Sequence, residues 1–213
     1  MGADGRSGRR AVFLDRDGVI NRNVLNPATG ELEAPLTAAE FEVLPGVPEA
    51  LRRLQAAGYL LFVVSNQPNY AKGKSTLREL RAVDRAMRDA LDAMRVRTAA
   101  VYYCLHHPEG VVPGYAAPCA CRKPAPYFLL KAAREFGIDL SQSWMVGDRA
   151  TDVECGRRAG ARAILVGASA DDSRADWVGR DLAEAAGHIL DGTRAPAPGR
   201  HESRADGAED RSV

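Results

Sequence analysis

Four aspartates occur as two pairs in this sequence, and their spacing suits the binding of a metal ion. Asp15 and Asp17 directly follow the apolar residues 11–14, and Asp148 and Asp152 follow a later apolar segment in the same way. Carboxylates gathered at one edge of a sheet repel one another unless a cation lies among them. Oxygen ligands of this kind favour magnesium, so the pairs together predict a magnesium site.

A serine and a lysine extend this set toward phosphate chemistry. Ser65 follows the apolar residues 59–64, and Lys123 lies between the two aspartate pairs in the sequence. Phosphoryl transfer needs an in-line nucleophile and neutralisation of charge, which these residue types supply. Turn formation or helix capping would explain either aspartate pair alone. It explains both pairs, the serine and the lysine together less well.

Three cysteines and a histidine pair form a second candidate metal site. Cys104 is followed by His106 and His107, and Cys119 and Cys121 come after an intervening loop rich in Pro and Gly. Three thiolates and one imidazole suit tetrahedral zinc without an open position, which is a structural site. The alternative is a cluster of free thiols in a loop. Spacing does not decide between the two histidines.

Short apolar segments alternate along the chain with segments of helical periodicity. These patterns predict the strands and helices that position the candidate residues. We expect strands at residues 11–14, 59–64, 99–103, 144–146 and 163–166. Apolar stripes predict helices around residues 47–54, 77–94, 126–136 and 151–160, and Cys155 lies alone on the last of these. Alternating strands and helices imply an α/β fold with a Rossmann-like, doubly wound parallel sheet, whose ligands lie at the carboxyl ends of the strands.

The composition predicts one globular domain between two tails. Residues 1–9 and 192–213 are rich in Gly, Arg, Pro and Ser, so we expect both to be disordered and the domain to span residues 10–191. The chain of 213 residues has a formal net charge of +1 and no broad basic stretch, which argues against nucleic-acid and membrane partners. It has no apolar segment of membrane-spanning length and no signal peptide, so we expect a cytoplasmic monomer that binds a small molecule.

The order of these residues resembles the four motifs of haloacid-dehalogenase (HAD) superfamily phosphatases. Asp15-x-Asp17-Gly18, Ser65, Lys123 and Gly147-Asp148-x-x-x-Asp152 match them in sequence order. The resemblance implies that Asp15 attacks phosphorus to form an aspartyl phosphate, and that Asp17 protonates the leaving group and then activates water. It also implies magnesium bound by Asp15, Asp148 and the carbonyl of Asp17, a phosphate held by Ser65 and Lys123, and a supporting role for Asp152.

A narrower resemblance comes from the cysteine loop. Cys104-x-His106 and Cys119-x-Cys121-Arg122-Lys123-Pro124 are similar to the branch that contains D-glycero-D-manno-heptose 1,7-bisphosphate 7-phosphatases and histidinol-phosphate phosphatases. The likeness favours His106 as the fourth zinc ligand and implies a zinc-binding loop without a large cap domain. It also implies a sugar-phosphate substrate. The expected substrate contacts are Arg16, Asn21, Asn66, Gln67, Lys72, Arg122 and Arg149.

The segment after Ser65 departs from the pattern of the heptose enzymes. It reads Asn66-Gln67-Pro68-Asn69-Tyr70-Ala71-Lys72-Gly73-Lys74, with a proline where a flexible glycine is usual. This change motivates the hypothesis that the alpha anomer is preferred over the beta anomer. Lys72 and Lys74 are candidates for contacting a second phosphate, or are ordinary solvated lysines. Histidinol phosphate as the substrate and a non-catalytic zinc-containing scaffold remain the alternatives.

Overall fold

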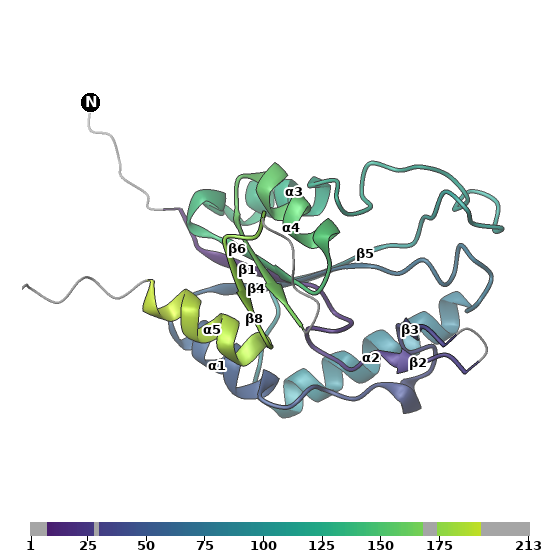
Figure 1. Ribbon diagram of the computed structural model, residues 1–213, viewed down its shortest axis with the longest axis horizontal. Helices are drawn as coiled ribbons and strands as arrows, with labels where there is room; N and C mark the ends of the chain where they lie inside the picture. The colour runs from purple at the N-terminus through teal and green to yellow at the C-terminus, as the bar shows by residue number, and fades with distance from the viewer. Residues whose placement is uncertain (1–7, 28–29, 168–173, 193–213) are drawn as a thin grey trace, which may run out of the picture.

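The computed structural model describes residues 8–27, 30–167 and 174–192. Its main feature is a parallel sheet with the strand order β5-β4-β1-β6-β7-β8 (Figure 1). The strands are β1 (Ala11–Leu14), β4 (Leu60–Asn66), β5 (Ala100–Cys104), β6 (Trp144–Gly147), β7 (Arg162–Val166) and β8 (Trp177–Gly179). The predicted parallel α/β fold is therefore confirmed.

Helices cover both faces of this sheet because its central strands are apolar on both sides. In β1, Val12 and Leu14 face one core cluster, whereas Ala11 and Phe13 face the other. The first cluster includes side chains from α1 (Val47–Ala56), α2 (Leu77–Ala93) and α5 (Leu182–Asp191), and the second includes side chains from α3 (Tyr127–Phe136) and α4 (Ala150–Ala159). Figure 1 shows the two groups of helices on opposite sides of the sheet.

The chain reverses its direction of winding at the centre of the sheet. It runs outward from β1 through β4 to β5 and then returns to add β6 on the other side of β1. A crevice for ligands is expected where strand order reverses, at the carboxyl ends of the strands. The backbone N–H of Asp15 donates to the carbonyl of Val146 at 2.9 Å, which joins the ends of β1 and β6 at this point.

Several elements differ from the sequence-based expectation. Ser65 and Asn66 belong to β4 rather than following it, because they pair with Tyr103 and Cys104 of β5. Elements that the sequence analysis did not predict are the antiparallel pair β2 (Val24–Leu25) and β3 (Leu32–Glu33), β8, α5, and short 3-10 helices at Ala38–Glu40 and Leu140–Gln142.

The two ends of the expected domain differ in detail from the prediction. Arg9, expected to lie in a disordered tail, donates its backbone N–H to Gly137 at 3.0 Å and accepts from Asp139 at 2.9 Å. Gly192 caps α5 through its N–H. The remainder of the two predicted tails, residues 1–7 and 193–213, lies outside the described residues. None of the helices in the described part of the chain has the length and apolar character to cross a bilayer.

Candidate active site and metal sites

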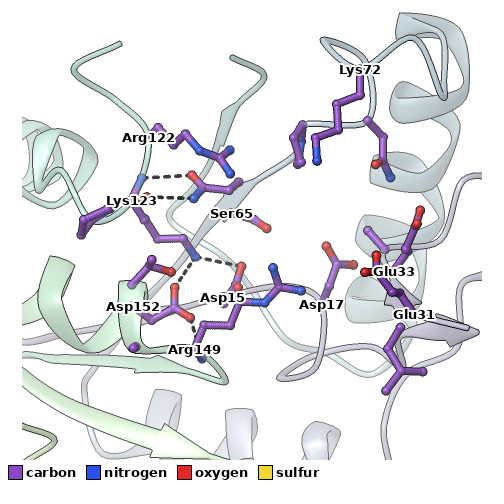
Figure 2. Close-up of a pocket in the computed structure, with 18 of the residues that line it drawn as sticks. Asp15, Asp17, Glu31, Glu33, Ser65, Lys72, Arg122, Lys123, Arg149 and Asp152 are labelled. Carbon is purple, nitrogen blue, oxygen red and sulfur yellow. Dashed lines mark hydrogen bonds and ion pairs between the residues drawn. The ribbon is translucent and has the colours of Figure 1, made fainter. Parts of the chain in front are cut away.

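A buried lysine joins the two predicted aspartate pairs. Lys123 Nζ lies 3.0 Å from Asp15 Oδ1 and 2.6 Å from Asp152 Oδ1, and it donates to the carbonyl of Val64 at 2.7 Å (Figure 2). Burial alone would lower the pKa of Lys123, but the two carboxylates outweigh it and raise that pKa above its usual value. A permanent positive charge therefore lies beside Asp15.

Asp148 lies beside Asp15 and Asp152, where a cation could bind among the three carboxylates. Ligand atoms of Asp15, Asp148 and Asp152 all lie within 4.8 Å of one another. Asp148 Oδ1 is buried and has no hydrogen-bond partner in the described part of the chain. Burial, followed by repulsion from Asp15 and Asp152, raises the pKa of Asp148 to about 7. Arg149 Nε lies 3.9 Å from Asp148 Oδ1, beyond hydrogen-bond distance. A buried oxygen without a hydrogen bond, among repelling carboxylates, fits a hard divalent cation such as magnesium.

Two glycines let the backbone approach these carboxylates. Gly18 has φ +83°, and a Cβ at this position would overlap the carboxylate of Asp148. A Cβ at Gly147 would overlap the side chain of Asp152. Asp152 is fully buried and accepts the backbone N–H of Arg149 at 3.1 Å, where α4 begins. Asp152 also contacts Lys123, and its supporting role stays a prediction.

Three of the expected substrate contacts instead surround Asp17. Arg16 Nε, Asn21 Nδ2 and Gln67 Nε2 donate to the Asp17 carboxylate at 3.0, 3.0 and 2.6 Å. Each is at most 1% exposed, and none of the three lines the cavity described below. Their donors are directed at Asp17 from its protein side, so in the structure these three side chains hold Asp17 in place and do not face the cavity.

Two neighbouring residues of β4 contribute to the site in different ways. Ser65 is buried, and its Oγ accepts from Gln67 Nε2 at 3.1 Å. The Asn66 side chain donates to the carbonyl of Lys123 at 3.1 Å and accepts the Lys123 N–H at 3.0 Å. Asn66 thereby fixes the backbone that carries the buried ammonium group.

The predicted zinc ligands come together around one point. The Sγ atoms of Cys104 and Cys119 are 3.4 Å apart, as are those of Cys119 and Cys121, and His106 Nδ1 lies 3.9 Å from Cys104 Sγ and 3.8 Å from Cys121 Sγ. Tetrahedral zinc with Zn–S bonds of about 2.3 Å separates its ligands by about 3.8 Å. The residues therefore fit this metal. The neighbouring histidine, His107, instead accepts the N–H of Glu109 at 3.1 Å through its ring.

The loop that carries the zinc ligands is attached to the segment 68–74. The N–H groups of Val111 and Val112 donate to the carbonyl of Ala71 at 2.6 and 3.1 Å. The Tyr115 ring lies between His106, at a centroid distance of 5.3 Å, and Tyr70, at 4.8 Å. Order at the cluster of Cys104, His106, Cys119 and Cys121 can therefore be transmitted to the segment that bears the lysines.

These elements enclose a cavity of about 920 Å³ above the carboxylates. Asp15, Asp17 and Ser65 line it, as do four of the expected substrate contacts, Asn66, Lys72, Arg122 and Arg149. Arg122 also donates to the carbonyl of His106 at 3.2 Å, which links the cavity to the zinc loop. Glu31 and Glu33 line the cavity as well, and Figure 2 shows them on the far side from Lys123 and Asp152. The sequence analysis missed these two residues, although Glu31-Leu32-Glu33 has the alternation of a short strand.

Comparison with known proteins identifies the group to which this fold and site belong. A family model described as HAD-hydrolase-like matches residues 120–190. The D-glycero-beta-D-manno-heptose-1,7-bisphosphate 7-phosphatase of Rhodopseudomonas palustris is 39% identical over 152 residues, which cover 71% of this chain and 80% of the relative. The protein of the same name from Salmonella typhi is 37% identical over 181 residues, covering 82% and 92%.

A solved structure agrees with these relatives. The crystal structure of D,D-heptose 1,7-bisphosphate phosphatase from B. bronchiseptica, complexed with magnesium and phosphate, matches with a TM-score of 0.70 at 29% identity and covers 86% of this chain and 99% of that one. A parallel sheet with carboxylates at the ends of its two central strands defines an HAD-like phosphatase. This chain belongs to the D-glycero-D-manno-heptose-1,7-bisphosphate 7-phosphatase family.

Proposed function

We propose that this protein removes the 7-phosphate of D-glycero-D-manno-heptose 1,7-bisphosphate, in the biosynthesis of a nucleotide-activated heptose. The observation that carries the proposal is the contact of Asp15 with the buried Lys123, at the floor of a cavity that further cations line. The names of the relatives support the same substrate.

The proposed reaction proceeds in two steps on Asp15. A carboxylate oxygen of Asp15 attacks phosphorus, the bond from phosphorus to the sugar oxygen breaks, and Asp17 supplies a proton to that oxygen. Water then attacks the aspartyl phosphate and gives its proton to Asp17, which releases inorganic phosphate and regenerates Asp15. The proton that Asp17 supplies in the first step is the one that it takes up from water in the preceding turnover, and the oxygen that carries this proton exchanges one of its present hydrogen bonds for the leaving oxygen.

The other catalytic residues act by binding and charge neutralisation. Lys123 neutralises charge on Asp15 and on the phosphoryl group, and the Ser65 hydroxyl donates to a phosphoryl oxygen. Asp15, Asp148 and the carbonyl of Asp17 would hold magnesium, which supplies charge neutralisation at the phosphoryl oxygens when it is bound. Magnesium in the related crystal structure supports this assignment.

Cys104, His106, Cys119 and Cys121 would hold a structural zinc ion. Their ligand atoms all lie within 4.8 Å of one another, and the loop between them is too polar to be ordered by a core of its own. Arg122 follows directly after the last of these thiolates. We therefore assign to the zinc site the ordering of one cavity wall.

The charges around the cavity favour a bisphosphate over a phosphorylated amine. Besides the catalytic group, Lys72, Lys74, Arg122 and Arg149 line the cavity together with Glu31 and Glu33, and Lys74 is paired with Glu33. Histidinol phosphate remains the second candidate because Glu31 and Glu33 would suit an amine. The excess of cations is better matched to a second phosphate.

The proposal extends to the setting in which the enzyme works. We propose a cytoplasmic monomer that acts on a small sugar phosphate without nucleic-acid or membrane partners. Size-exclusion chromatography with light scattering tests the monomer directly.

Phosphate release with magnesium from the alpha and beta anomers of the heptose bisphosphate, and from histidinol phosphate, tests the function. We expect a large kcat/KM advantage for one heptose anomer, and no turnover by Asp15→Asn. The relatives are named for the beta anomer, whereas the altered segment 66–74 motivates the alpha anomer. Preference for histidinol phosphate would reject the substrate but not the chemistry. Failure to hydrolyse even an aryl phosphate would indicate the non-catalytic scaffold.

A further inference from the structure

An ion pair joins the small β2–β3 sheet to the lysine-bearing segment 68–74. Lys74 Nζ lies 2.8 Å from Glu33 Oε1, between residues separated by 41 positions in the chain. The Glu33 side chain is 15% exposed and that of Lys74 is 39% exposed, so the pair is partly shielded from water. It connects two parts of the cavity wall that are distant in sequence.

The carboxylate of Glu33 is fixed in this position and ionised. Asn26 Nδ2 donates to the same oxygen at 3.0 Å, which restrains the carboxylate from the neighbouring strand end. The hydrogen bond from Lys74 is the main cause that lowers the pKa of Glu33, with smaller contributions from Asn26 and from the charge of Lys72. Glu33 is therefore charged at neutral pH and neutralises one of the two lysines of the segment.

The two residues form part of the outer wall of the cavity. Glu33 and Lys74 both line it, together with Leu32 and Lys72. In Figure 2, Glu33 lies across the cavity from Lys123 and Asp152, with Asp17 between them. A phosphate held at Asp15 therefore leaves this wall to the distal part of the substrate.

We propose that Glu33 is a specificity-determining positioning residue, whose ion pair with Lys74 holds the outer wall in place for the distal end of an elongated substrate. The inference rests on the proposed function in one respect, that the substrate is a sugar bisphosphate long enough to reach this wall. A small phosphate ester reacts at Asp15 without contacting the pair. Loss of the pair therefore raises KM for the long substrate and leaves turnover of a small aryl phosphate unchanged.

Charge-neutral and charge-exchanged variants test this role in the full-length, metal-loaded protein. We expect Glu33→Gln and Lys74→Gln each to raise KM for the heptose bisphosphate about threefold, within the range of partly exposed ion pairs, with kcat little changed. The double variant Glu33→Lys with Lys74→Glu restores the pair with reversed charges. It should return KM close to the wild-type value.

Glu42→Gln is the matched control because it removes an ion pair of the same kind outside the cavity. Glu42 pairs with Arg22 at 3.1 Å, with both side chains more than half exposed, and neither residue lines the cavity. This variant should leave KM unchanged. A KM that stays constant in Glu33→Gln overturns the proposal. A KM that falls also overturns it, since it would mean that Glu33 competes with the substrate for Lys74. Failure of the exchanged pair to restore KM overturns it as well.

Hydrogen–deuterium exchange separates this inference from the identity of the substrate. Without substrate, Glu33→Gln should accelerate amide exchange in β2 and β3, and the exchanged pair should slow it again. If the wild-type enzyme does not prefer the bisphosphate, the proposed function fails. This measurement still tests whether the Glu33–Lys74 pair stabilises the β2–β3 sheet. Unchanged exchange in Glu33→Gln rejects that stabilising role, whatever the substrate proves to be.

Discussion

Replacing Lys123 by Met is the most informative perturbation of the catalytic site. Lys123 is 3% exposed and neutralises both Asp15 and Asp152, the second of which is fully buried. Removing one partner of a buried ion pair costs about 3–5 kcal/mol because the remaining charge has no compensation. At about 2–4 °C per kcal/mol in a protein of this size, we expect the Tm to fall by about 10 °C.

Stability and activity should respond differently when the second charge is also removed. In Lys123→Met with Asp152→Asn, the asparagine keeps an acceptor for the N–H of Arg149 and no longer carries a buried charge. We expect this double variant to recover much of the lost stability. It should remain about 10²–10³-fold less active than the wild type, because the positive charge beside the phosphoryl group is still absent.

Thermal unfolding in magnesium-free buffer with zinc retained, and phosphate release with magnesium, measure the two effects. Lys131→Met is the control, since Lys131 pairs with Glu135 on the surface of α3, where loss of a pair costs less than about 1 kcal/mol. A Lys123→Met protein as stable as the control would refute the buried-charge reasoning. Recovery of activity together with stability in the double variant would refute the catalytic role of Lys123.

Three further outcomes follow from contacts around the site. Gly147→Ala should lower kcat at least about tenfold, because the added Cβ displaces Asp152. Steady-state kinetics measure kcat, and an unchanged circular dichroism spectrum shows that the variant is folded. A kcat equal to that of the wild type would contradict this prediction. Tyr115→Ala should raise KM for the bisphosphate about threefold, whereas Tyr115→Phe should not, since only the first removes the ring between His106 and Tyr70. We expect elemental analysis to find one zinc ion per chain in the wild type and less in Cys119→Ser, together with a lower Tm of the variant. A wild-type protein without zinc would contradict the assignment.

The convergence of the aspartates was predictable from sequence because the carboxyl ends of parallel strands meet at one edge of a sheet. Asp15 and Asp148 each follow an apolar segment, so the pairing of β1 with β6 brings them together whatever the conformation of the loops. The convergence of the cysteines with His106 was predictable for a different reason. Cysteines at short spacing on both sides of a polar loop have few roles apart from binding a metal.

The surroundings of the catalytic centre were less predictable because sequence does not show which side of a residue faces solvent. Arg16, Asn21 and Gln67 have the polar side chains expected of substrate contacts, yet each is buried and directed at Asp17. Conversely, Glu33 belongs to a strand of two residues, and the alternation Glu31-Leu32-Glu33 is too short to identify a strand by itself. Its approach to Lys74 depends on tertiary contacts that neither segment encodes alone.

The placement of residues on strands or on loops predicts how mutations will divide between kcat and KM. Asp15, Ser65 and Asp148 lie in or directly after strands whose register is fixed by neighbouring strands, and Asn66 holds the backbone of Lys123 from β4. The outer wall depends instead on contacts of the segment 68–74 with the short strand β3 and with the loop that carries Tyr115, namely the Glu33–Lys74 pair and the Tyr70–Tyr115 contact. Substitutions in the wall can therefore alter which substrate fits while the phosphoryl-transfer geometry is retained.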